Sequence, residues 1–272
     1  MTDLFSLKKK VAVVTGALGL LGKQHCSALA EAGATVIVTD LNGERCEAFA
    51  RELGTATATK PVGIGADITH RASVEALRDR IFRDHPEIDI LVNNAAINDA
   101  FENPAAAAEQ SKFENYPLEL WQRSLDVNIT GTFLCSQVIG KVMAGQGRGS
   151  IINIASTYGL VGPDQSLYRQ EDGKQSFYKS PSYPTTKGAV LAFTRFLATY
   201  WAKSGVRVNA LSPGGVENGQ DKAFIEHYAT RTPLGRMAQP TDYKGALIFL
   251  ASDASGYMTG SNLVVDGGWT AW

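Results

Sequence analysis

The chain has 272 residues, of which 44% are hydrophobic and 19% charged, enough apolar material for one large α/β domain or two small ones. Its formal net charge of −1 gives no overall basic field, which argues against nucleic acid or an anionic membrane as principal partners. No apolar run reaches the roughly 18 residues of a membrane helix, and the three scattered cysteines lack disulfide or zinc spacing, so we expect a soluble cytoplasmic protein.

Short apolar runs alternate with segments of helical periodicity from one end of the chain to the other. The pattern predicts strands at residues 11–15, 35–39, 88–92, 150–155, 206–211 and 262–265. It predicts helices at residues 20–32, around Val74, Leu77 and Ile81, and at 118–143, 184–203 and 243–251. Strands that are apolar on both faces and separated by helices indicate a doubly wound parallel sheet. No linker or change in composition interrupts the alternation, so residues 1–272 are expected to form one domain.

Three long segments have no clear periodicity: residues 97–117, 157–182 and 214–234. Long irregular segments in a compact domain are commonly lids or binding loops. We therefore expect a substrate flap at 157–182 and a lid at 214–234.

Three glycines, Gly16, Gly19 and Gly22, stand between the first strand and the first helix. Glycines at this place let backbone N–H groups approach a pyrophosphate at the helix N-terminus. Asp40 ends the second strand, where its carboxylate would bind both ribose hydroxyls and repel a 2′-phosphate. The pattern favours NAD over NADP, although Lys23 is close in sequence and Asp40 could instead be a helix N-cap.

Tyr183 is the only tyrosine in the chain with a lysine, Lys187, four residues later. On a helix this spacing places both side chains on one face, where an ammonium favours the ionised phenol. Such a tyrosine could move a proton near neutral pH, although most pairs of this kind are surface neighbours.

Taken together, these motifs resemble the short-chain dehydrogenase/reductase family along nearly the whole chain. The resemblance rests on the glycine turn, on Tyr183 with Lys187, and on further motifs in family order. These are Asp67-Ile68, Asn93-Asn94-Ala95-Ala96, Leu125-Asp126-Val127-Asn128, Ser156, Arg207-Val208-Asn209, Pro213-Gly214 and Asp266-Gly267-Gly268. It implies a single-domain Rossmann fold with a parallel sheet of about seven strands and helices on both faces.

The resemblance also implies roles. Tyr183 would be the acid/base, Lys187 would lower the tyrosine pKa and bind the nicotinamide ribose, Ser156 would hold the substrate oxygen, and Asn128 would anchor a water of a proton relay. The cofactor would lie against Gly16, Gly19, Leu21, Gly22, Asp40, Leu41, Asp67, Ile68, Asn94, Ala95, Ala96, Tyr183, Lys187, Pro213, Gly214 and Val216. No metal site is expected, because the four histidines form no ligand cluster in the sequence.

Two departures from the family pattern are visible. The glycines are separated by two residues and two residues, as in extended members, which include nucleotide-sugar epimerases and dehydratases that retain NAD. Ser156 and Tyr183 stand 27 positions apart, about twice the family distance, so an insertion lies between them. An NAD-retaining epimerase or dehydratase and a non-catalytic dinucleotide sensor therefore stay open beside the oxidoreductase.

The loops suggest the substrate. A pocket edged by polar side chains would suit a sugar, sugar acid or sugar derivative whose secondary alcohol is oxidised. The side chains expected at its edge are Asn98, Asp99, Tyr158, Asp164, Glu217, Asn218 and Gln220. Basic residues of the insertion, Arg169, Lys174 and Lys179, leave room for a phosphorylated or nucleotide-linked form. The resemblance also implies a homodimer or homotetramer built on the two long helices, with Trp269 and Trp272 at a second interface.

Overall fold

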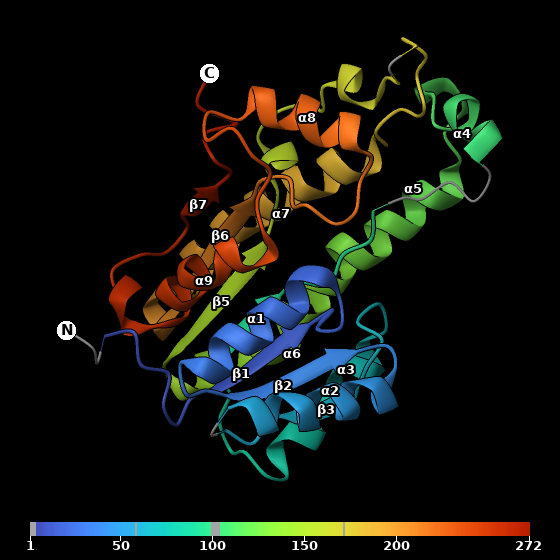
Figure 1. The fold of residues 1–272 in the computed structure, drawn as a ribbon. Coiled ribbons are helices and arrows are strands. Elements are labelled where there is room, and N and C mark those ends of the chain that lie inside the picture. Colours follow the sequence, from blue (N-terminus) through green and yellow to red (C-terminus); the bar gives the residue numbers. More distant parts are fainter. Residues whose placement is uncertain (1–3, 58, 99–103, 171) are drawn as a thin grey trace.

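The structure is a computed structural model that describes residues 4–57, 59–98, 104–170 and 172–272. All seven strands belong to one parallel sheet with the order β3-β2-β1-β4-β5-β6-β7 (Figure 1). The strands are β1 (Val11–Thr15), β2 (Thr35–Asp40), β3 (Val62–Gly65), β4 (Ile90–Asn93), β5 (Gly149–Ile154), β6 (Val206–Pro213) and β7 (Asn262–Val265). The order reverses at β1, and the predicted doubly wound sheet is confirmed.

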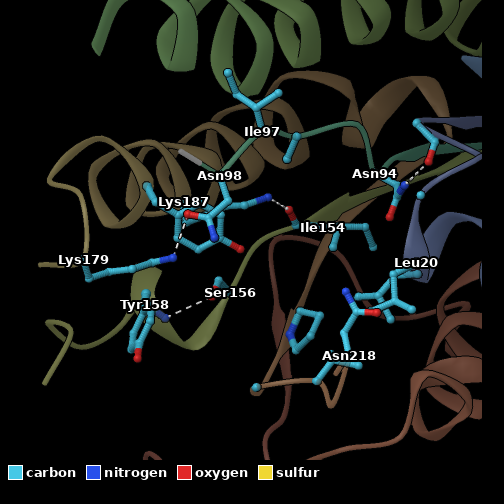
Figure 2. Close-up of a pocket in the computed structure, with 18 of the residues that line it drawn as sticks. Leu20, Asn94, Ile97, Asn98, Ile154, Ser156, Tyr158, Lys179, Lys187 and Asn218 are labelled. Atoms are coloured by element: carbon cyan, nitrogen blue, oxygen red, sulfur yellow. Dashed lines mark hydrogen bonds between the residues drawn. The ribbon is translucent and has the colours of Figure 1, made fainter. Parts of the chain in front are cut away.

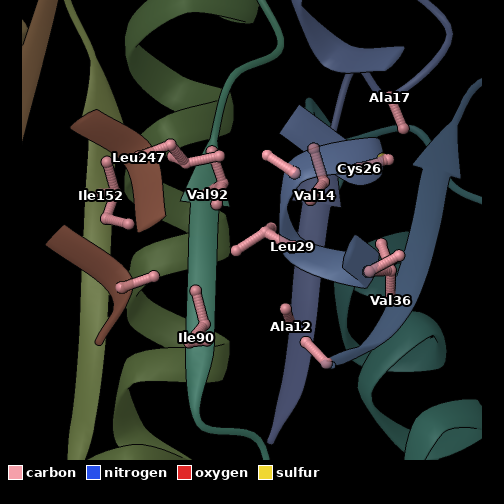
Figure 3. Close-up of a cluster of buried hydrophobic side chains, with 14 of the residues drawn as sticks. Ala12, Val14, Ala17, Cys26, Leu29, Val36, Ile90, Val92, Ile152 and Leu247 are labelled. Carbon is pink, nitrogen blue, oxygen red and sulfur yellow. The ribbon is translucent and has the colours of Figure 1, made fainter. Parts of the chain in front are cut away.

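Helices cover both faces of the sheet because its central strands are apolar on both sides. On one face lie α1 (Leu20–Glu31), α2 (Gly43–Ala56) and α9 (Lys244–Ala251); on the other lie α3 (Arg71–Phe82), α6 (Thr132–Gln146) and α7 (Ser182–Trp201). Ala12 and Val14 of β1 join the first core, and Val11 and Val13 join the second. Figure 3 shows the first core, in which Leu29 of α1 packs against this face of the sheet.

The remaining helices lie toward the carboxyl ends of the strands: α4 (Pro104–Gln110), α5 (Leu118–Leu125) and α8 (Lys222–Arg231) (Figure 1). The sequence predicted loops over α4 and α8. It also predicted a single helix at 118–143, where the structure has α5, a π-helical turn over Asp126–Gly131, and α6.

The sequence patterns did not reveal α2 and β3. Two of the four residues in β3 are glycines, which have low strand propensity. A Cβ added to Gly63 would lie 2.2 Å from the backbone nitrogen of Glu47, so close packing against α2 excludes a side chain there. The same packing that fixes β3 thus removes its sequence signal.

Cys26, Cys46 and Cys135 are all buried free thiols. Among the described residues, no helix is both long enough and apolar enough to cross a membrane.

His25 of α1 is fully buried, and neither ring nitrogen has a hydrogen-bond partner by geometry among the described residues. Burial lowers its pKa to about 4, while the nearby Asn94 side chain acts in the opposite direction. The imidazole is therefore neutral in the folded protein at neutral pH, whereas it titrates normally in the unfolded chain.

We expect His25 to make the protein sensitive to acid. Because its pKa is lower in the folded state, its contribution to stability is complete above pH 6.5 and is lost as the pH falls toward 4. The loss over this range is about 3 kcal/mol. The free energy of unfolding in urea should fall by about 3 kcal/mol less in His25→Leu than in the wild type between pH 6.5 and 4. His227→Gln, at an exposed histidine, should show the same change of stability with pH as the wild type. Equal losses in His25→Leu and wild type would contradict this account.

Candidate active site and cofactor cleft

A cavity of about 1600 Å³ opens along the carboxyl edge of the sheet. Its wall contains Ser156, Tyr183 and Lys187 and every residue that the sequence predicted to bind the cofactor. Asn128 is buried and lies outside the wall. The cavity therefore brings together all but one of the predicted site residues.

The turn after β1 is shaped by two of its three glycines. Gly16 has φ +61°, and an added Cβ would lie 2.6 Å from Cα of Ala95. A Cβ on Gly22 would lie 2.2 Å from the carbonyl oxygen of Gly16, so neither position accepts a side chain. At Gly19 the corresponding distance to the Gly16 oxygen is 3.3 Å, a milder contact. The turn leads into α1, whose first backbone N–H groups suit an anionic pyrophosphate.

Asp40 lies at the end of β2 and holds the backbone of two neighbouring segments. Its carboxylate oxygens accept hydrogen bonds from the N–H groups of Leu18, at 3.1 Å, and Leu41, at 2.8 Å. It is not the cap of the following helix, because the Asn42 side chain occupies that position and accepts from the Arg45 N–H. Lys23 points elsewhere, with its Nζ 5.7 Å from the ring centroid of Phe49 on α2.

Asp67 and Ile68 follow β3 and also line the cavity. The hydroxyl of Thr69 donates to the Asp67 carboxylate at 2.6 Å, and this bond is the main reason that the pKa of Asp67 lies below its usual value. The cavity wall continues after β4 with Asn94, whose amide donates to the carbonyl oxygens of Thr15 and Gly16. The ends of β1 and β4 are thus joined directly beneath the glycine turn.

The first turns of α7 present Tyr183 and Lys187 to the cavity. The buried Lys187 donates from Nζ to the carbonyl oxygen of Ile154 at 2.7 Å, as Figure 2 shows, and Nζ lies 5.7 Å from the Tyr183 ring centroid. Burial lowers the pKa of Lys187 to about 8. The hydrogen bond to the end of β5 therefore offsets part of the free energy lost when the ammonium is desolvated.

The pKa of Tyr183 is raised by burial, and a hydrogen bond with the Ser156 side chain acts in the opposite direction. The sequence motif suggested a Tyr183 pKa lowered toward neutral pH. In the protein without cofactor, the pKa is instead raised. Added positive charge in the cavity would be needed to lower this pKa.

Asn128 lies in the π-helical turn, and its side-chain amide is fully engaged. Its Oδ1 accepts from the Ile97 N–H at 2.8 Å, while its Nδ2 donates to the Ile97 carbonyl and to the Thr186 hydroxyl, both at 3.1 Å. Its contact with α7 is therefore through the residue next to Lys187, and the structure gives it no direct bond to Lys187.

The insertion between Ser156 and Tyr183 packs against α8. Tyr168 lies 4.5 Å from Phe177 and 5.5 Å from Phe224 between ring centroids, and Arg231 at the end of α8 pairs with Asp164. Trp269 stacks on Tyr228 of α8 at 4.2 Å, whereas Trp272 is exposed. The insertion and α8 together form one side of the cavity.

The sequence predicted a polar wall on this side of the cavity, whereas the wall is partly polar and partly apolar. Asn98, Tyr158, Asn218 and Gln220 line the cavity, but Asp164 and Glu217 do not, since Asp164 pairs with Arg231 and Glu217 accepts from Gln239. Asp99 lies outside the described residues. The wall also contains apolar and aromatic side chains beyond that polar set: Leu167, Tyr168, Phe177, Phe224, Tyr228 and Met237. Phe224 and Tyr228, four residues apart, were the available signal for α8.

Comparisons with known proteins place the chain. Residues 16–270 match the family model described as enoyl-(acyl carrier protein) reductase. D-threitol dehydrogenase from Mycolicibacterium smegmatis is 35% identical, over 98% of this chain and 95% of that protein. 2-Dehydro-3-deoxy-D-gluconate 5-dehydrogenase from Pseudoalteromonas atlantica is 35% identical over 99% of each chain. A crystal structure of gluconate 5-dehydrogenase from Burkholderia cenocepacia, in complex with NADP and tartrate, matches with a TM-score of 0.86 and 31% identity, covering 100% of this chain and 99% of that one.

With this fold and these motifs, the chain belongs to the short-chain dehydrogenase/reductase family. It is an NAD(P)-dependent dehydrogenase that acts on CH–OH groups.

Proposed function

We propose that the protein oxidises a secondary alcohol of a sugar, sugar acid or sugar derivative, or reduces the corresponding ketone. The observation that carries this is the placement of Ser156, Tyr183 and Lys187 on the wall of the same cavity as the amide side chains of Asn98, Asn218 and Gln220. Amide groups can bind several hydroxyls at once. Relatives named for a polyol and for sugar acids support the same substrate class.

In the oxidation direction, the Tyr183 phenolate takes the proton of the substrate hydroxyl while Ser156 donates a hydrogen bond to the same oxygen. A nicotinamide cofactor held in this cleft would supply the acceptor for the hydride of the substrate carbon. Lys187, fixed by the Ile154 carbonyl, supplies positive charge near the phenol and a donor for the ribose hydroxyls. Asn128 fixes the segment after β4 against α7, and we assign to it the anchoring of a water of the proton relay.

We expect Tyr183→Phe to lower kcat by about 10²- to 10⁴-fold, because the acid/base is removed while the ring is kept. Initial rates with NAD⁺ and a panel of polyols and sugar acids measure the loss, and quenching of protein fluorescence by NADH checks that the cofactor still binds. Tyr178→Phe removes a phenol from the same segment outside the cavity wall and should retain activity. Activity of Tyr183→Phe within a few-fold of the wild type would refute the assignment of Tyr183.

We further propose that NAD is preferred over NADP. The carboxylate of Asp40 would face the ribose hydroxyls, its cavity-lining neighbour Leu41 carries no positive charge, and Lys23 is directed at Phe49. A 2′-phosphate would be repelled by this carboxylate without a cation to offset it.

Asp40→Asn keeps an acceptor oxygen and removes the charge. The ratio of kcat/KM for NAD⁺ to that for NADP⁺ should fall by about tenfold or more, since one uncompensated charge contact is worth at least about 1.4 kcal/mol. Asp79→Asn, an exposed change on α3, is the matched control. A ratio that stays within about twofold of the wild type would show that Asp40 does not select the cofactor.

The flap and lid are proposed to act as one unit. Residues 157–182 and 214–234 both line the cavity, and they are joined by Tyr168 with Phe224 and by Arg231 with Asp164 and Ser166. Both segments come after strand ends that carry site residues, which suits closure over a bound substrate.

Arg231→Gln should loosen this unit, because it removes the ion pair with Asp164 and weakens the hydrogen bond to Ser166. We expect KM for the alcohol to rise about two- to tenfold, as for a half-exposed charged contact, while the Kd for NAD⁺ is unchanged. Lys222→Gln at the exposed start of α8 is the control. If the KM values of the two variants agree with the wild type, the flap does not depend on this tether.

A homodimer or homotetramer and a cytoplasmic location remain predictions from the sequence. An aromatic row on α6 and α7, formed by Phe133, Phe193, Phe196 and Tyr200, would supply the interface that the family resemblance implies. Phe196 and Tyr200 are 59% and 67% exposed in the single chain, and light scattering would decide whether they are covered by a second copy.

A further inference from the structure

A second lysine reaches the Tyr183 ring from outside helix α7. Lys179, near the end of the insertion, places its Nζ 4.7 Å from the Tyr183 ring centroid, closer than the 5.7 Å of Lys187. Its Nζ donates to Oδ1 of Asn98 at 2.6 Å, and Figure 2 shows this bond. Both Lys179 and Asn98 line the cavity, so an ammonium is held inside it close to the Tyr183 ring.

The position of Lys179 is fixed by the backbone of the insertion. Its N–H donates to Oε1 of Gln165 at 2.7 Å, and Nε2 of Gln165 donates back to the Lys179 carbonyl at 3.2 Å. Gln175 in turn donates to the Gln165 carbonyl at 2.7 Å. The base of the lysine is therefore held in place before a substrate arrives, which reduces the entropy lost on binding an anion.

The proton transfer proposed above assigns its positive charge to Lys187 and gives Lys179 no role. Lys179 belongs to the lengthened segment that separates Ser156 from Tyr183. A fixed ammonium in a partly enclosed cavity is a strong partner for a carboxylate, because a charge-assisted hydrogen bond there is about twice as strong as a neutral one.

We infer that Lys179 is a specificity residue that binds the carboxylate of a polyhydroxylated acid and so favours sugar acids over neutral polyols. The inference rests on the proposed function, because it assumes a polyhydroxylated substrate with a secondary alcohol at Tyr183. It adds the charge of that substrate and the residue that recognises it.

The kinetic test compares D-gluconate with D-glucitol, which carries a CH₂OH group in place of the carboxylate. In Lys179→Met, the ratio of kcat/KM for gluconate to that for glucitol should fall by about 10- to 100-fold, as expected for loss of a charged hydrogen bond. Taking the ratio removes any effect on Tyr183 that is common to both substrates. Lys179→Arg keeps the charge and should restore most of the ratio, and Lys174→Met, at an exposed lysine of the same insertion that does not line the cavity, should leave it unchanged.

Binding of tartrate to the NAD⁺-loaded enzyme, measured by calorimetry, tests the same contact without turnover. Tartrate is a small hydroxylated dianion, and its Kd should rise by about 10- to 100-fold in Lys179→Met but not in Lys174→Met.

The outcomes separate this inference from the proposed function. If no polyol or sugar acid is oxidised, the proposed function fails, and the tartrate measurement alone decides whether the cavity has an anion site at Lys179. If polyols are oxidised but neither the ratio nor tartrate binding changes in Lys179→Met, or the wild type does not bind tartrate, the inference fails and the proposed function stands. If kcat/KM falls equally for both substrates and the pH profile of kcat shifts, Lys179 acts on Tyr183. This result would also overturn the inference.

Discussion

The side-chain amide of Asn128 joins three segments that lie far apart in the sequence. Its Oδ1 accepts from the Ile97 N–H after β4, and its Nδ2 donates to the Ile97 carbonyl and to the Thr186 hydroxyl in α7. Asn128 itself stands in the turn between α5 and α6. A buried amide loses several kcal/mol of hydration and regains it only when all these partners are in place. This one group therefore ties the first turns of α7, which carry Tyr183 and Lys187, to the segment after β4.

The sequence predicted best where structure is local. Strands β1, β2 and β4 to β7 appear as apolar runs, and Gly16, Asp40, Tyr183 and Lys187 could be placed because each follows a recognisable strand or lies on a strongly periodic helix. Helix α8 was missed because only Tyr228 among its ten residues is buried, which leaves almost no periodic signal. The spacing of Phe224 and Tyr228 was the one available signal, and the residues that cover them, Tyr168 and Trp269, lie elsewhere in the chain.

Lys179 illustrates a different limit. It stands four residues before Tyr183, the mirror image of the spacing that singled out Lys187, yet α7 begins only at Ser182. Helical geometry therefore brings Lys187 to the phenol but says nothing about Lys179. The insertion folds back on itself, and Gln165 bonds the backbone of Lys179 and so places the second lysine near the phenol. Local sequence patterns do not predict such a contact. The polar wall expected from loop composition was incomplete for the same reason, since aromatic residues from two loops meet only in the folded chain.

The π-helical turn at Asp126–Gly131 makes the length of this helix as important as its residues. A π-helical turn contains one residue more than an α-helical turn, and each residue of a helix turns the chain by about 100°. Removing one residue here would restore a regular helix, yet it would rotate α5 against α6 and carry Asn128 away from Ile97 and Thr186. The number of residues in this turn therefore constrains the site as much as the identity of Asn128 does.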